Sequence, residues 1–401
     1  MLAPTSIKIG EPVLRWTARA HTIAEIETEL ARIWSTPDLT TQIEGASARH
    51  VAARTSVMNL IVVARRPEIA ERCAAIIQAL TGRHPSRTIV IQSADPDGPS
   101  WLDARIEAHC VLPREDAPET CAETIHLVCG GESGRHLAAI ATPLIVHDLP
   151  VTVWWPGEPP FTTRAAQDLL ACADRLVVDG STWSGDGLAR LRDMARLLDT
   201  TDLAISDFAL VRQSRWREAI ASTFDDPDLL PYLRSIRRIA VTYGTHDEAA
   251  APGSTNLVKP IYHVGWLASR LGLTVVEPLA PAAARPARPA GPDPGLVATL
   301  SDGHAAVAVS IRPIRSPMPS GTTLQVELLA ERRGVELRID VTAEAETVHV
   351  RVWQSRVEVL DRSFRAARRT DVDLLAEAIE AGERDPVAIG ALRSAATLAE
   401  G

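Results

Sequence analysis

The stretch CGGESGRH (129–136) contains the residues of this sequence that best fit an anion-binding site. Its glycines fall between an expected strand and an expected helix, where backbone N–H groups at a helix start can hold a negative charge. The candidate anion-binding residues are Gly130, Gly131, Ser133, Gly134 and Arg135. The stretch lacks the Walker lysine and the spacing G-x-G-x-x-G, so the same residues also fit a tight turn with Ser133 as helix N-cap.

Two further groups of polar residues have side chains suited to binding or proton transfer. In GRHPSR (82–87), the guanidinium of Arg87 could hold a phosphate or a partner's carboxylate, or it could pair with a nearby acid. His147 and Asp148 are adjacent, and a carboxylate can orient an imidazole for proton transfer, but the pair equally fits a capped loop. No serine lies in a G-x-S-x-G setting. The sequence therefore predicts no catalytic residues.

The stretch LPVTVWWPGEPPF (149–161) places two tryptophans directly before prolines. Neighbouring side chains of a strand point to opposite faces, so Trp154 and Trp155 cannot lie on one face of a sheet. Either helices cover both faces, or one indole is available to a partner. We expect one indole in the core and the other near the carboxyl edge of the sheet. There Pro156 begins a rigid turn that could form a ridge for a partner protein.

The elements that would position these residues alternate between strands and helices over the first half of the chain. Apolar runs of strand length lie at 57–64, 86–92, 151–155 and 175–180, and helical patterns separate most of them, including one expected at 134–146. This pattern predicts an α/β fold with a mostly parallel, doubly wound sheet and helices on both faces. We assign it to an N-terminal domain, residues 1–200.

The second half predicts an α+β domain, residues 201–401. It begins with one long helix at 207–226 and continues with alternating apolar and polar residues at 324–341 and 346–353, typical of an antiparallel meander. Two short helices near the C-terminus, at 372–381 and 386–400, would close the dry face of that sheet. Residues 278–295 are rich in proline and alanine and predict an exposed loop or linker.

The composition argues against several classes of function. The net charge of −9 disfavours nucleic acid as a partner, because such proteins normally present a basic face. No apolar run is long enough to span a membrane and the N-terminus has no signal pattern, so we expect a cytoplasmic protein. The five cysteines lack a C-x-x-C pair and predict buried free thiols, with no metal site and no cofactor. They are Cys73, Cys110, Cys121, Cys129 and Cys172.

Five stretches carry a resemblance to a known family. They are MNLIVVA (58–64), HPSRTIVI (84–91), DLPVTVWWPGEPP (148–160), LLDTTDLAISDFALVRQSRWREAIASTFD (197–225) and VGWLASRLG (264–272). In this order they resemble the OpcA family of bacterial glucose-6-phosphate dehydrogenase assembly proteins, with HPSR and DLPV-x-x-WWP the most specific. Two features depart from the family: the loop at 278–295 is longer than expected, and no cysteine follows Cys172.

The resemblance implies a non-catalytic two-domain protein that binds glucose-6-phosphate dehydrogenase and promotes its active oligomer. It would thereby support NADPH production by the oxidative pentose phosphate pathway. Because aromatic residues and arginine often anchor interfaces, the candidate partner-binding residues are Trp154, Trp155, Pro156, Arg87 and Trp216. An alternative is a phosphosugar-binding enzyme or metabolite sensor, with Arg87 or Arg135 as the clamp. A third is a degenerate nucleotide- or sugar-binding domain kept as a scaffold.

Overall fold

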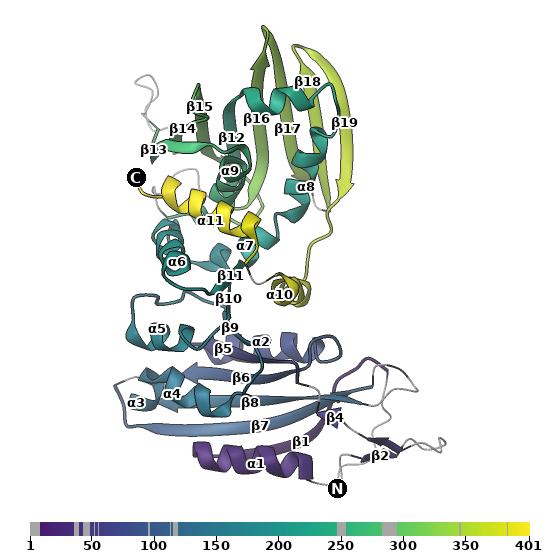
Figure 1. Ribbon diagram of the computed structural model, residues 1–401, viewed down its shortest axis with the longest axis vertical. Coiled ribbons are helices and arrows are strands. Elements are labelled where there is room, and N and C mark those ends of the chain that lie inside the picture. The colour runs from purple at the N-terminus through teal and green to yellow at the C-terminus, as the bar shows by residue number, and fades with distance from the viewer. Residues whose placement is uncertain are drawn as a thin grey trace. The chain divides into compact units, whose positions relative to one another are not determined.

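The computed structural model divides the chain into two compact units (Figure 1). Unit 1 comprises residues 1–178 and 371–383, and unit 2 comprises residues 179–370 and 384–401. The residues that the structure describes are 9–35, 40–42, 49–51, 53–54, 56–94, 97–112, 114, 119–246, 254–282, 295–344, 346–382 and 384–401. The domain boundary expected at 200/201 stays a prediction.

Unit 1 is built on a mixed sheet with a parallel centre. Its strand order is β1-β7-β8-β6-β5-β9-β10, and β4 pairs with β8. The pairs from β8 through β6, β5 and β9 to β10 are parallel, whereas β1 and β7 run antiparallel to their neighbours. The bounds are β1 Val13–Ala20, β4 Ala53–Arg54, β5 Met58–Ala64, β6 Ser86–Ser93, β7 Trp101–Val111, β8 Thr120–Gly130, β9 Val151–Trp155 and β10 Arg175–Val178; β2 (Thr40–Gln42) and β3 (Arg49–Val51) form a separate pair.

Helices connect the parallel strands of unit 1. Helix α2 (Pro67–Ala79) joins β5 to β6, and α5 (Arg164–Leu170) joins β9 to β10 on the other side of β5. Crossovers between parallel strands are right-handed. The connection from β5 to β6 and the connection from β9 to β10 run across the sheet in opposite directions, so their helices cover opposite faces. The remaining helices are α1 Ile23–Ser35, α3 Glu132–Arg135, α4 Leu137–Ala141, the 3₁₀ turn η2 Thr142–Leu144, and α10 Asp371–Glu380.

The single helix expected at 134–146 was wrong. The chain forms α3, α4 and η2 instead, because His136 leaves the helical region at φ −114° and ψ 57° and Pro143 has no backbone N–H.

Unit 2 contains a sheet with the strand order β13-β14-β15-β12-β16-β17-β18-β19. Strands β12 and β15 pair in parallel, and the other pairs are antiparallel. The bounds are β12 Ile236–Thr245, β13 Thr274–Pro281, β14 Leu296–Ser301, β15 Ala306–Arg315, β16 Thr323–Arg332, β17 Val335–Glu344, β18 Thr347–Gln354 and β19 Val357–Arg365. The expected meander is β16 to β18 with β19 added at its edge, whereas β13, β14 and β15 were not anticipated.

Helices α8 (Ser214–Thr223) and α9 (Val258–Leu271) contact the strands of this sheet, and α11 (Pro386–Leu398) packs on α9. The other elements of unit 2 are η3 Gly180–Thr182, α6 Leu188–Thr200, β11 Ala204–Asp207, α7 Phe208–Val211 and η4 Leu230–Ser235. The long helix expected at 207–226 is therefore two helices preceded by a short strand. The helix expected at 372–381 does not close this sheet, because α10 belongs to unit 1 and contacts α2.

The two-domain α/β fold class is confirmed, although individual elements differ. The expected loop at 278–295 lies largely outside the described residues, since β13 ends at Pro281 and β14 begins at Leu296. Among the helices of the described residues, none combines the length and apolar character needed to cross a membrane.

The prediction of five free, buried cysteines was wrong for three of them. Cys110 and Cys121 face each other on β7 and β8 and form a disulfide, while Cys172 is free but exposed. Cys73 and Cys129 are buried free thiols, and burial raises the pKa of Cys73 to about 12. Within the described residues, Cys110, Glu119 and Cys121 form one cluster of side chains that could hold a metal ion. Both sulfur atoms of this cluster are joined in the disulfide.

Candidate functional site

The strand order of unit 1 reverses between β5 and β9, and this point governs where a ligand would bind in a doubly wound sheet. Ligands of such sheets lie outside the carboxyl ends of the strands on either side of the reversal. After β5 the chain reads Arg65-Arg66-Pro67, without the glycines of a dinucleotide site, and Arg66 lies 3.3 Å from Glu68. After β9 it reads PGEPP (156–160), so the tryptophan-proline stretch lies at this edge.

Both indoles of β9 are buried. The strand lies between β5 and β10, with Trp154 opposite Val62 and Trp155 opposite Val178, and the exposed fractions of the two tryptophans are 2% and 4%. Pro156 is buried as well. Of the two alternatives, the structure thus has the one in which both indoles are covered, and the ridge expected at the turn after Trp155 stays a prediction. A role for these three residues in partner binding stays a prediction.

Arg87 on β6 is held by other groups of unit 1. Its Nε donates to Glu123 Oε2 at 2.5 Å and its Nη1 donates to the Leu144 carbonyl at 3.1 Å. The indole N–H of Trp34 donates to the other oxygen of Glu123. Arg87 thus makes the local acid pair that was one of its two alternatives, and only 8% of it is exposed.

The neighbouring histidine of the HPSR stretch reaches a helix distant in sequence. His84 Nε2 lies 2.8 Å from Glu380 Oε1 on α10, and Arg83 Nη2 lies 2.6 Å from the same oxygen. Both contacts are within unit 1. The sequence did not suggest this partner, because it follows almost 300 residues later.

The glycine-rich turn at 129–136 is arranged as a tight connection. Gly131, at φ +59°, occupies the N-cap position of α3 without a side-chain cap, so Ser133 is not the cap. The N–H groups of Glu132 and Gly134 donate to Ser100 Oγ and the Gly131 carbonyl. Arg135 Nη2 lies 2.7 Å from Asp97 Oδ1. These contacts explain the turn locally, and anion binding by Gly130, Gly131, Ser133, Gly134 and Arg135 stays a prediction.

Trp216 is the one partner-binding candidate that belongs to unit 2. It is half-buried on α8, and its ring lies 5.2 Å from that of His263 on α9. His263 is fully buried, and burial lowers its pKa to about 3. The indole therefore lies against a neutral imidazole, and a role of Trp216 in partner binding stays a prediction.

Sequence reasoning missed a buried polar cluster in unit 2. Asp207 accepts hydrogen bonds from the N–H groups of Gly180 and Ala209 and from the hydroxyl of Tyr262. Burial, followed by the nearby charge of Asp179, raises its pKa to about 6. Because Asp207 and Tyr262 are almost fully enclosed, the cluster is suited to a structural role. Asp207 precedes α7 as an N-cap, a signal hidden inside the single helix expected there.

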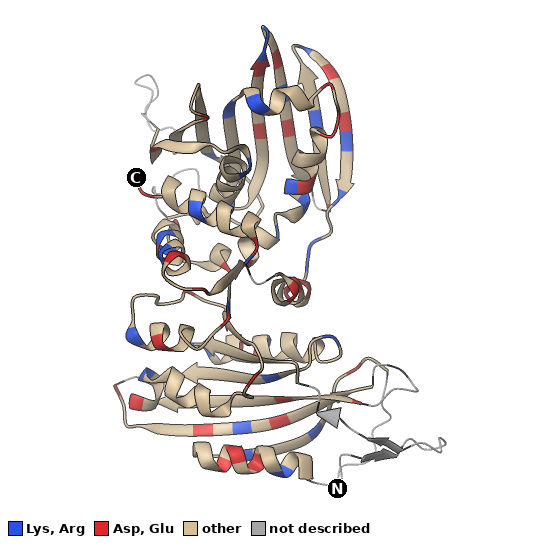
Figure 2. Ribbon diagram, viewed as in Figure 1, with Lys and Arg blue, Asp and Glu red and all other residues tan. Residues whose placement is uncertain are grey.

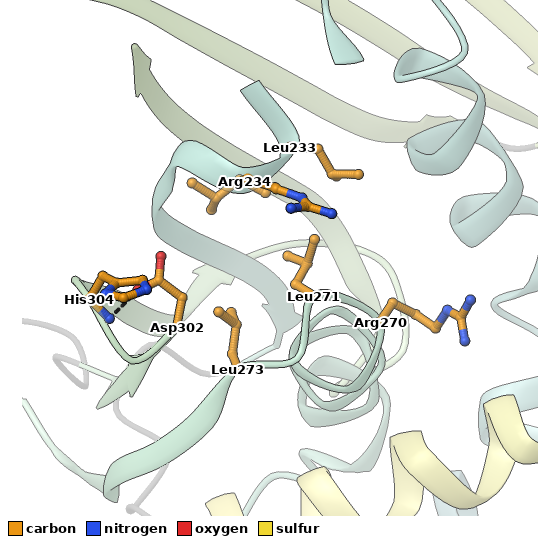
Figure 3. Close-up of a pocket in the computed structure, with 8 residues that line it drawn as sticks. Leu233, Arg234, Arg270, Leu271, Leu273, Asp302 and His304 are labelled. Carbon is orange, nitrogen blue, oxygen red and sulfur yellow. Dashed lines mark hydrogen bonds between the residues drawn. The ribbon is translucent and has the colours of Figure 1, made fainter. Parts of the chain in front are cut away.

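Unit 2 also has a surface pocket of about 470 Å³ (Figure 3). It is bounded by η4, the end of α9 and the turn between β14 and β15. Leucines and Ile236 form its apolar part, and Arg234 and Arg270 lie on the side opposite Asp302 and His304 (Figure 3). Its lining residues are Leu233, Arg234, Ile236, Arg270, Leu271, Leu273, Asp302 and His304. These residues come from three separate segments, so their proximity could not be read from the sequence.

Comparison with protein families assigns both halves of the chain. Residues 77–196 match the model described as "Glucose-6-phosphate dehydrogenase subunit N-terminal domain", and residues 203–389 match the corresponding C-terminal domain. Both models carry the OpcA name. This chain belongs to the OpcA family.

An OpcA protein of Synechocystis sp., named as an OxPP cycle protein, is 26% identical over 205 residues. The match covers 51% of this chain and 41% of that protein. The shared region is thus less than half the length of this OpcA relative.

The solved structures that resemble this chain do so with low TM-scores. Gal80p, a transcriptional regulator from Kluyveromyces lactis, has a TM-score of 0.41 at 11% identity and covers 80% of this chain and 82% of its own. KijD10, a 3-ketoreductase from Actinomadura kijaniata, has a TM-score of 0.42 at 13% identity, with 86% and 96% covered. At these scores the likeness carries no argument about what an OpcA-family chain does.

Proposed function

We propose that this chain binds glucose-6-phosphate dehydrogenase in the cytoplasm and promotes assembly of its active form, without catalysing a reaction itself. The observation that supports this proposal is the match to both OpcA-family domain models, over residues 77–196 and 203–389. Through this effect on the dehydrogenase, the protein would support NADPH production.

Activation of this kind requires no chemistry on the chain. A protein that binds the active assembly of an enzyme more tightly than its inactive form shifts the population by that difference in binding free energy. About 1.4 kcal/mol of preference gives a tenfold shift. Interfaces of ordinary size bury about 1,600 Å² in total.

The test combines the purified dehydrogenase with this protein. NADPH formation is recorded by absorbance, and the mass of the dehydrogenase assembly is measured by light scattering, with and without the added chain. We expect a higher rate together with a larger or more populated oligomer. An unchanged rate and an unchanged mass at saturating concentration would refute the proposal. The chain alone with glucose 6-phosphate and NADP serves as the control for intrinsic activity.

A further inference from the structure

We propose that the pocket of unit 2 bounded by η4, α9 and the β14–β15 turn is a docking site for a segment of the partner protein that carries a carboxylate beside a large apolar side chain. The inference rests on the proposed function, because it names the surface through which the dehydrogenase would be held. The pocket volume, about 470 Å³, is in the range of pockets that enclose a few side chains.

The carboxylate is argued from two arginines of the pocket. Arg234, in the last turn of η4, and Arg270, in the last turn of α9, make no ion pair or hydrogen bond with another described residue. Both are exposed. A guanidinium presents several N–H donors in a plane and binds a carboxylate in a bidentate manner. Arg234 and Arg270 both line the pocket without a partner among the described residues, and they therefore favour an acidic group there.

Some arginines on the sheet of unit 2 have partners within the unit. Acidic and basic residues are interspersed along β16 to β19 (Figure 2), and Arg351 lies 3.8 Å from Asp361 there. Arg338 lies 4.2 Å over the ring of Trp353. In a protein whose net charge is −9, cations without such partners create a local surface that attracts acid.

The apolar side chain is argued from the wall of the pocket. Leu233, Leu271 and Leu273 line it, and each is only half-buried. Leu230, in the same 3₁₀ helix, is 52% exposed. An apolar side chain that covers these leucines removes their surface from water at about 25 cal/mol per Å². A free sugar phosphate fits this wall less well, since its hydroxyl groups would face leucine rather than hydrogen-bonding partners.

The far end of the pocket orients the segment. Asp302 accepts backbone hydrogen bonds from Ala305 and His304, which lower the pKa of its carboxyl group below its usual value. A second carboxylate at that end would be repelled. The segment therefore places its acid toward Arg234 and Arg270 and its apolar side chain over the leucines.

The experiment measures the affinity of the full chain for purified dehydrogenase at several salt concentrations. The double variant Arg234→Glu/Arg270→Glu is compared with Arg333→Glu/Arg356→Glu, which makes the same change in net charge at two exposed hairpin turns. We expect the pocket variant to bind at least tenfold more weakly and with a shallower salt dependence, and the hairpin variant to bind nearly as the wild type does. Circular dichroism and the melting temperature confirm that both variants fold.

A third variant, Leu233→Ser, tests the apolar contact. It should weaken binding while leaving the salt dependence unchanged, because no charge is removed. Equal binding by the pocket variant and the wild type would overturn the docking inference and leave the proposed function standing. Equal losses in the two double variants would also overturn it, because attraction would then depend on total charge. Failure of the wild type to bind at all would refute the proposed function itself.

Discussion

His84 Nε2 lies 2.8 Å from Glu380 Oε1, and this contact joins the HPSR stretch after α2 to the last residue of α10. Arg83 adds a second charged contact to the same carboxylate. Arg175 donates to the carbonyl groups of Ala381 and Gly382, just beyond the helix. Helix α10 is thus held in unit 1 at its C-terminal end by side chains from the start of β10 and from the turn that follows α2.

Glu380→Gln should loosen α10 at neutral pH. The hydrogen bond from His84, and then the contacts of Arg83, lower the pKa of Glu380, so its stabilising effect is present above the usual value near 4.5 and is lost as pH falls below it. Hydrogen exchange over residues 371–380 should therefore be faster in the variant than in the wild type at pH 7. The difference should shrink as pH falls below 4.5, because Glu380 is then progressively protonated. Glu331→Gln, at an exposed glutamate in unit 2, is the control, and equal exchange at pH 7 would contradict the role of this contact.

Asp207→Asn should remove a pH dependence of folding stability. Because the folded-state pKa of Asp207 is raised from 3.8 to about 6, the folded protein binds the proton more tightly, and its stability falls as pH rises from about 4 to 6. The loss is on the order of 3 kcal/mol. Asparagine keeps both backbone N–H contacts and can donate to the Tyr262 oxygen.

Denaturant titrations of Asp207→Asn and the wild type at pH 4 and pH 7 measure this effect. The difference between the two proteins isolates Asp207, since His263, whose pKa is lowered to about 3, contributes stability that is lost as pH falls below 6.5 in both. Asp302→Asn is a control of the opposite sign, because the pKa of Asp302 is lowered. If the stability of Asp207→Asn changed with pH as that of the wild type does, burial would not raise the pKa of Asp207.

Trp155→Ala should chiefly lower stability. With 4% of the residue exposed in the centre of the sheet, loss of the ring leaves a cavity that costs about 3–5 kcal/mol. Trp216→Ala, at a half-buried position, should lower stability less. Thermal unfolding of both variants is the measurement. A nearly unchanged melting temperature for Trp155→Ala, together with weaker binding to the dehydrogenase, would support the ridge hypothesis.

Gly265→Ala should destabilise unit 2 although alanine is the better helix former. A Cβ atom at this position of α9 would lie 2.6 Å from the Ala391 carbonyl oxygen and 2.9 Å from the Ala395 nitrogen of α11. The two helices must move apart, at a cost of about 1–3 kcal/mol. Gly157→Ala is the matched control, because nothing lies within 4 Å of its Cβ position. Equal denaturation midpoints for the two variants would argue against close packing of α9 on α11.

Cys110→Ser/Cys121→Ser should lower the stability of unit 1. The disulfide closes a loop between residues 11 apart, and releasing a loop of this size costs about 3 kcal/mol in the chain-entropy account. Intact-mass measurement under non-reducing conditions, with alkylation of the free thiols, should leave two cysteines unmodified in the unfolded wild-type chain. Alkylation of all five would show that the bond does not form.

The elements anticipated correctly are those with a strong local pattern. Strands β5, β6 and β9 are apolar runs, and α2 begins at a proline, so neighbours along the chain determine each of them. Strands β13 to β15 were missed because prolines and alanines around 278–295 obscured the alternation next to them. Prolines are tolerated in a strand at the edge of a sheet, and β13 is an edge strand.

The candidate sites were harder to anticipate than the strands. Residue type alone suggested that Arg87 and Trp155 faced a partner, but the burial of each depends on elements from elsewhere in the chain, such as Glu123 on β8 for Arg87. Nothing in the sequence singled out Arg234 and Arg270, because they belong to no motif and line one pocket only when η4 and α9 are placed together. The spacing of residues along the chain does not show which distant segments will come into contact in the fold.

The path of α10 has a consequence for biosynthesis. Residues 371–383 complete unit 1, although the whole of the second sheet is synthesised before them. On the ribosome, the final helix of the first unit therefore emerges only after the whole second sheet has been synthesised. A shortened fragment that stops before residue 371 would leave the groups that hold Glu380 without their carboxylate. A complete copy of the first unit, produced apart from the second, would therefore include that helix as a separate peptide or a graft.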